Sequence, residues 1–219
     1  MVMREAFLTE LKDLKDEIRF LGERVQEFYK ETNALILDKN FPAIQDIIEQ
    51  DEEINRIELD INEKVTLMIA KQQPVASDLR KVIVSLKVSS DLERIGDLTV
   101  DMGKAALHMK QTNLLTENRS TLYAMSQKVG SMLEQVLTAF QTSNVLAAQH
   151  IAQLDDEIDR MYGEFVKQLF ESNSTNPDCI EQVTQLAFIA RYLERIADYG
   201  TNIAEWIIYE VNGQRFDLN

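Results

Sequence analysis

The sequence predicts an all-α protein made of two homologous three-helix bundles, with six long helices and pseudo-two-fold symmetry between the halves. Three observations support this fold class. Apolar residues recur at steps of three and four over most of the chain, as they do on one face of a helix. Only seven glycines and three prolines occur in 219 residues, which nearly excludes an all-β fold. The second half also repeats motifs of the first.

The first predicted helix runs from Phe7 to Leu35. Its apolar side chains form a seam like that of a coiled coil, in which Thr32 fills one place. The seam consists of Phe7, Leu11, Leu14, Ile18, Leu21, Val25, Phe28 and Leu35. The same spacing returns in the second half at Leu122, Met125, Val129, Met132, Val136 and Ala139. We therefore expect a long helix at the start of each half.

Two further helices complete the first half. Asn40 followed by Phe41-Pro42 predicts a helix start, and the periodic pattern then continues to Ala70. Gln73-Pro74 interrupts the chain, and a third helix is expected from Asp78 to about Lys110. The polar stretch from Thr112 to Arg119 predicts the connector between the halves. The expected units are residues 1–112 and 113–219.

The repeat is visible as two pairs of motifs. Residues 51–56 (DEEINR) match residues 155–160 (DDEIDR) at an offset of 104, and residues 92–97 (LERIGD) match residues 193–198 (LERIAD) at an offset of 101. A connection three residues shorter in the second half explains the different offsets. Each half is thus predicted to be a copy of one helical unit.

Acidic residues follow one face of the third helix of each half. Glu93, Asp97 and Asp101 are spaced four residues apart, so their side chains form a stripe. The second half has the corresponding stripe Glu194, Asp198 and Asn202. The preceding helices add the pairs Asp51 with Asn55 and Asp155 with Asp159. Like charges at this spacing destabilise a helix, so the pattern needs a compensating partner.

The hairpin register predicts that these acids meet. If the helices are antiparallel about loops centred near Pro74 and Asn176-Pro177, residues equidistant from each loop lie side by side. The facing pairs are then Asp51 with Asp97, Asn55 with Glu93, Asp155 with Asp198, and Asp159 with Glu194. Each half gathers four carboxylates and one amide, a donor set that suits Mg²⁺, Mn²⁺, Ca²⁺ or iron.

Two alternatives to metal binding remain open at this point. The acids can form a solvated helix face, although their duplication in register argues against it. Arg94 and Arg195 can also pair with the carboxylates and leave no room for a cation. A ferritin-like di-iron oxidase is rejected, because neither His108 nor His150 stands three residues after a glutamate. We expect both histidines to be surface residues.

Composition and charge narrow the function classes. The net charge is −14 and no window holds five lysines or arginines, so the protein is not expected to bind nucleic acid or a lipid surface directly. Cys179 is the single cysteine, and the chain starts without an apolar signal segment, so we expect a cytoplasmic protein. No glycine-rich phosphate loop is present. Gly96 and Gly103 are expected to permit close packing between helices.

Four stretches resemble the PhoU family, the accessory regulators of bacterial phosphate-specific transport. They are residues 72–80 (QQPVASDLR), 91–97 (DLERIGD), 190–198 (ARYLERIAD) and 208–213 (IYEVNG), and the resemblance covers nearly the whole chain. It implies a homodimer with multinuclear metal clusters, of iron or of Zn, Mn, Mg or Ca in its place, on E(D)xxxD motifs. Asn55 and Asn202 depart from the all-acid motif, and an amide oxygen is a weaker ligand than a carboxylate. No organic cofactor is implied.

The same resemblance implies a non-enzymatic negative regulator of phosphate uptake and of the phosphate-regulon two-component pathway. Its partners would be the sensor histidine kinase and the ATPase subunit of the phosphate ABC transporter, and it would reach the inner face of the membrane only through them. Two other functions stay open from the residues themselves. One is a metal-dependent hydrolase that uses the acid clusters, and the other is a purely structural scaffold in which the acids are solvated.

Overall fold

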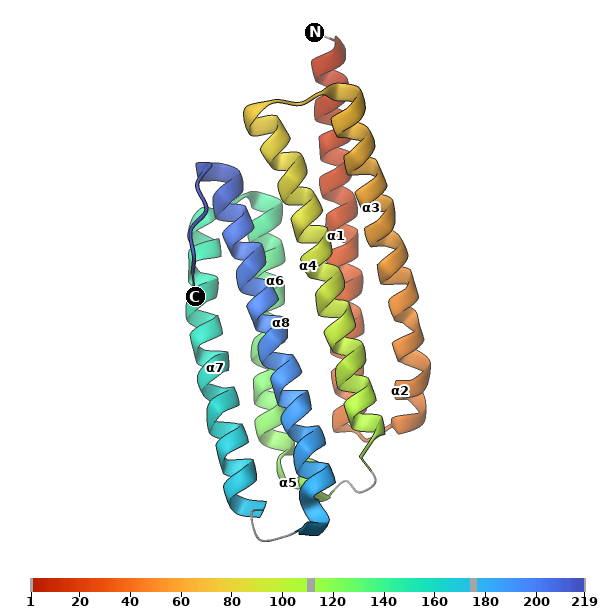
Figure 1. Ribbon diagram of the computed structural model, residues 1–219, viewed down its shortest axis with the longest axis vertical. Coiled ribbons are helices and arrows are strands. Elements are labelled where there is room, and N and C mark those ends of the chain that lie inside the picture. The colour runs from red at the N-terminus through yellow and green to blue at the C-terminus, as the bar shows by residue number, and fades with distance from the viewer. Residues whose placement is uncertain (1, 110–112, 174–176, 219) are drawn as a thin grey trace.

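The computed structural model describes residues 2–109, 113–173 and 177–218, and these residues contain helices and no strand (Figure 1). The first half comprises the helices α1 (Val2–Leu37), α2 (Phe41–Ile47), η1 (Ile48–Gln50), α3 (Asp51–Gln72) and α4 (Ala76–Leu107). The second half comprises α5 (Asn113–Glu117), α6 (Arg119–Thr142), α7 (Val145–Asn173), η2 (Pro177–Cys179) and α8 (Ile180–Asn212). The all-α prediction with six long helices is confirmed.

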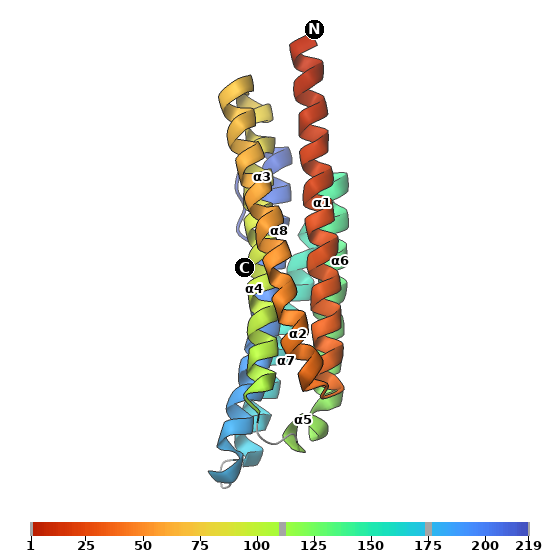
Figure 2. The ribbon, with the colours of Figure 1, turned by 90° about the vertical axis from the view of Figure 1, so that its right-hand side faces the viewer.

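The long helices run up and down along one axis (Figures 1 and 2). Helices α1, α3 and α4 form one three-helix bundle, and α6, α7 and α8 form the other. The two bundles join through α4, which packs on α8, and through α1, which packs on α6. The predicted boundary after residue 112 lies outside the described residues, as do Lys110 and Asn176. None of the described helices is both long and apolar enough to cross a membrane.

The predicted seams form the core. Leu14, Ile18 and Leu21 of α1 are fully buried, and Val129 and Val136 occupy the same kind of position on α6. Thr32, the polar residue in the first seam, is also fully buried. A coiled-coil-like spacing of apolar residues thus predicts which face of each long helix is turned inward.

Two segments differ from their predicted form. The helix expected between Pro42 and Ala70 is interrupted by the tighter turn η1, although Ile47 before it and Ile54 after it are both buried. The connector expected to be polar contains helix α5. Leu114 and Leu115 are buried there, and this burial folds the segment onto the bundle.

The glycines of α4 permit the expected close approach. A Cβ atom at Gly103 would lie 2.8 Å from Cγ2 of Ile48, and one at Gly96 would lie 3.0 Å from Oδ1 of Asp51. These distances are shorter than ordinary van der Waals contact. The absence of a side chain at these two positions therefore lets η1 and α3 lie this close to α4, and at Gly96 it brings the start of α3 next to the acidic stripe.

Candidate metal centre

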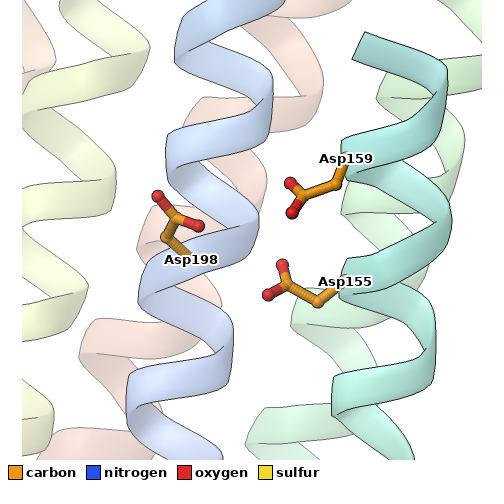
Figure 3. Close-up of side chains that lie close together, drawn as sticks. All are labelled: Asp155, Asp159 and Asp198. Atoms are coloured by element: carbon orange, nitrogen blue, oxygen red, sulfur yellow. The ribbon is translucent and has the colours of Figure 1, made fainter. Parts of the chain in front are cut away.

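The second half brings acidic side chains together from two helices. Asp155 and Asp159 lie one helical turn apart on α7, and Asp198 lies opposite them on α8. Figure 3 shows the carboxylates of Asp155 and Asp159 pointing from α7 toward α8, the helix that carries Asp198. One oxygen from each lies within 4.8 Å of the others. The predicted pairing of Asp155 with Asp198 across the hairpin agrees with this geometry.

Burial makes this cluster different from a solvated acidic face. Asp155 is only 3% exposed, and its Oδ1 accepts no hydrogen bond from any described residue. Burying an ionised carboxylate without a partner is costly. An all-oxygen group with an unsatisfied buried atom is the arrangement that a hard cation would complete.

Burial also changes the proton affinity of these acids. Burial raises the pKa of Asp155 to about 6; the charges of Asp159 and Asp198 contribute to this rise, and the nearby Thr201 hydroxyl opposes it. Burial raises the pKa of Asp198 as well, and the neighbouring Asp159 adds to this effect. Ionising these neighbouring buried acids therefore costs free energy, because their negative charges repel one another, and a bound cation would reduce this cost.

Glu194 lies beside the same cluster. It is 8% exposed, and burial together with Asp198 raises its pKa to about 7. Arg191 donates a hydrogen bond to Oε1 of Glu194, whereas Oε2 is buried and has no partner among the described residues. Sequence reasoning missed Arg191, although its place three residues before Glu194 is the spacing of a helical ion pair.

The first half has related side chains in a different arrangement. Asn55 Nδ2 donates a hydrogen bond to Oδ2 of Asp51 over 3.1 Å. Oδ1 of Asp51 and Oδ1 of Asn55 are buried, and neither has a hydrogen-bond partner in the described part of the chain. Burial raises the pKa of Asp51, and the charge of Asp97 adds to it, in agreement with the predicted facing pair.

Arginine occupies the first acidic stripe. Arg94 Nη1 lies 2.7 Å from Oδ2 of Asp97, and its Nε lies 3.5 Å from Oε2 of Glu93. Lys104 Nζ lies 3.9 Å from Oδ1 of Asp101. Among the described residues, a set of three carboxylates close enough to share one cation occurs only in the second half. The sequence alternative in which Arg94 pairs with the acids therefore applies to the first half.

The remaining predicted residues take peripheral places. Arg195, the counterpart of Arg94, is exposed, and its positive charge partly offsets the rise that burial causes in the pKa of Asp198. Asn202 is half-buried on α8, one turn beyond Asp198. His108 and His150 are exposed, as expected. The ten predicted ligands thus divide into the compact group of three aspartates, its neighbours Glu194 and Asn202, and five first-half residues, some of which pair with Arg94 and Lys104.

The donor sets fit a hard cation to different degrees. Asp155, Asp159 and Asp198 offer oxygen ligands at mutual distances compatible with one ion, and Glu194 adds an unpartnered oxygen nearby. In the first half Asp51 and Asn55 offer unpartnered oxygens, but a cation would compete with Arg94 for the third-helix acids. The second half is therefore the stronger candidate centre.

The chain is similar to known proteins over nearly its whole length. The profile of the PhoU domain matches residues 18–106 and residues 122–207. A phosphate-specific transport system accessory protein PhoU homolog of Clostridium acetobutylicum is 34% identical and covers 99% of both chains. The homolog of Streptococcus pneumoniae serotype 4 is 35% identical over 99% of this chain and 100% of its own.

Solved structures show the same similarity. The crystal structure of the phosphate transport system regulatory protein PhoU from Streptococcus pneumoniae has a TM-score of 0.89 and 33% identity, covering 96% of this chain and 99% of its own. The crystal structure of PhoU from Pseudomonas aeruginosa has a TM-score of 0.87 and 30% identity, covering 95% and 100%.

Proposed function

The chain belongs to the PhoU family, and from this premise we propose that it regulates phosphate transport as a non-catalytic accessory protein. The observation that carries the proposal is similarity along almost the full length, in sequence and in fold, to proteins named as accessory or regulatory components of phosphate transport. The regulation is negative, acting on phosphate uptake and on the phosphate-regulon two-component pathway.

We further propose that the protein acts through other proteins. Its partners are the sensor histidine kinase of the regulon and the ATPase subunit of the phosphate ABC transporter, and the working form is a cytoplasmic homodimer. Helical bundles without a membrane-spanning helix among the described residues suit an adaptor that reaches the membrane through such partners.

We propose that the acidic groups bind divalent or trivalent cations. Asp155, Asp159 and Asp198, with Glu194 beside them, would hold the cations of the second half. Asp51, Asn55, Glu93, Asp97 and Asp101 would hold those of the first half, and Asn202 would extend the second. When bound, a cation would neutralise buried negative charge and tie α7 to α8.

A cellular measurement tests the regulatory proposal. In a bacterial strain that lacks its own copy of this protein, we expect high expression of a phosphate-starvation reporter even in phosphate-rich medium. Reintroducing the gene should restore repression and lower the rate of phosphate uptake. Unchanged reporter activity and uptake in both strains would contradict the proposal. Phosphatase assays of the purified protein with added Mn²⁺ distinguish the two functions, because a metal-dependent hydrolase would show activity and a non-catalytic regulator would not.

A partner measurement tests the adaptor role. Pull-downs from extracts of cells grown in high and low phosphate should recover the kinase or the transporter ATPase, with a yield that depends on phosphate. Recovery of neither protein under either condition would remove the proposed partners.

A further inference from the structure

A groove of about 650 Å³ is lined by residues from the N-terminal parts of α1 and α4 and from the C-terminal ends of α6 and α8. Figure 1 shows these parts of the helices toward the end of the molecule that carries the N-terminus. Its wall carries four basic side chains, Lys12, Lys15, Arg80 and Lys81. The chain as a whole has a net charge of −14. Four cations in one groove therefore reverse the sign of the charge locally, and such a concave region concentrates anions.

The acidic residues of the groove are already paired. Lys15 Nζ lies 2.8 Å from Oε1 of Glu210, a buried carboxylate. Asp16, the other acid on the wall, lies 3.9 Å from Nε of Arg19. The charge of Glu210 is thus neutralised by Lys15, and Asp16 pairs with Arg19, which lies outside the groove.

Three cations are left without a carboxylate. Lys12, Arg80 and Lys81 form no ion pair with any acid in the part of the chain that the structure describes. They come from two helices, since Lys12 lies on α1 and the other two lie at the start of α4. The groove therefore holds an excess of positive charge that its own acids do not balance.

Packing fixes the position of Arg80. Its guanidinium lies 5.7 Å from the centre of the Tyr209 ring, and its Nη1 lies 3.5 Å from the backbone oxygen of Glu210. It also rests against Gly213, where a Cβ atom would come within 2.6 Å of Nη1. A guanidinium held in this way loses little conformational freedom when it binds an anion.

We propose that this groove binds a small molecule that carries a phosphate group, either inorganic phosphate or a phosphate monoester. A phosphate monoester has a charge of about −1.5 to −2 at neutral pH, which the three unpaired cations can match. Ser77 and Ser143 add hydroxyl groups to the wall. The volume is typical of a site for a small organic molecule, and Leu8 and Leu11 offer apolar contacts to its carbon atoms.

The acidic groups described above cannot serve this purpose by themselves, because clustered carboxylates repel phosphate unless a metal ion bridges them. The groove needs no metal. The inference rests on the charges and contacts of the groove and is independent of the proposed regulatory function.

Isothermal titration calorimetry of the full-length protein in EDTA tests the proposal. The probes are inorganic phosphate, glycerol 3-phosphate and AMP, with citrate as an anion that lacks phosphate. We expect at least one phosphate compound to bind, and the compound that binds most tightly identifies the source of the phosphate group. EDTA removes any metal that could bridge phosphate to the acids.

Two double variants distinguish binding in the groove from a general attraction of anions to positive charge. Lys12→Gln with Lys81→Gln should weaken binding by about tenfold or more, since hydrogen bonds to charged groups are lost. Lys30→Gln with Lys167→Gln makes the same charge change at exposed positions near the other end of the molecule and should leave the affinity within about twofold. Circular dichroism should show that both variants stay folded.

Three results would overturn the proposal: no binding by any of the three phosphate compounds, binding of citrate as tight as that of phosphate compounds, or equal loss of affinity in both double variants. Because binding is measured on the purified protein, failure here leaves the cellular test of phosphate regulation unaffected.

Discussion

At the scale of single residues, the absence of a side chain at Gly103 sets the distance between helices. A Cβ there would lie 2.8 Å from Cγ2 of Ile48 and 3.2 Å from Cγ2 of Ile44. Both atoms are branches directly on Cβ, so they move away only if the whole side chain changes rotamer. Gly163 on α7 is the opposite case, because nothing lies within 4 Å of its hypothetical Cβ.

This contrast gives a prediction with an internal control. Gly103→Ala should lower the free energy of unfolding by about 1–2 kcal/mol, since overpacking outweighs the better helix propensity of alanine. Gly163→Ala should raise it by about 0.5–1 kcal/mol through propensity alone. Urea denaturation measures both values. Stabilisation by both substitutions would show that α4 does not depend on a bare backbone at Gly103.

At the scale of elements, a partly buried hydrogen bond joins the two bundles. Trp206 Nε1 on α8 donates to Oδ2 of Asp91 on α4 over 3.0 Å. Burial raises the pKa of Asp91 to about 6, while Trp206, Lys87 and Arg215 lower it and Glu205 raises it. The sequence pattern did not reveal this pair, because Trp206 and Asp91 lie in different halves of the chain.

The raised pKa of Asp91 makes the stability depend on pH. The folded protein binds a proton at Asp91 more readily than the unfolded chain does, so this residue's contribution is complete below about pH 4 and is lost as the pH rises through about 6. Asp91→Asn keeps an oxygen that can accept from Trp206 but removes the titration. The free energy of unfolding of the variant minus that of the wild type should therefore grow by up to about 3 kcal/mol between pH 4 and pH 7.

Denaturation of both proteins across this pH range measures the effect. Subtracting the two curves removes the contributions of other buried acids that they share. A difference that stays constant from pH 4 to pH 7 would mean that Asp91 does not titrate differently in the folded protein.

The sequence predicted the positions of the helices better than it predicted the contacts between them. Apolar spacing located the long helices, and equal distances from the loops placed Asp155 near Asp198 and Asp51 near Asp97, because both follow from the regular geometry of helices. The turn η1 and helix α5 were missed. Ile47 and Ile54, which flank η1, are spaced as on one face of an unbroken helix, so the spacing does not reveal the turn. The burial of Leu114 and Leu115 depends on where the second bundle lies.

At the scale of the whole molecule, the duplicated sequence does not produce duplicated electrostatics. In the first half, Arg94 forms ion pairs with Glu93 and Asp97. In the second half, Arg191 pairs with Glu194, and no ion pair to Asp155, Asp159 or Asp198 occurs among the described residues. The sequence could show the repeat but not which arginine rotates onto which carboxylate. The same limitation hid the basic groove, whose lysines and arginine are far apart in the chain.

Metal content tests the central claim, that the acidic groups of the two hairpins bind cations. Protein purified without chelator should contain bound metal by inductively coupled plasma mass spectrometry, and the variant Asp97→Asn with Asp198→Asn should lose most of it. Asp60→Asn with Asp156→Asn changes the same charge at exposed positions of α3 and α7 and should retain the wild-type content. Asp198→Asn alone should lose more than Asp97→Asn alone, because Arg94 already competes for the first-half acids. Unchanged metal content in the Asp97→Asn, Asp198→Asn variant would contradict the assignment of both sites.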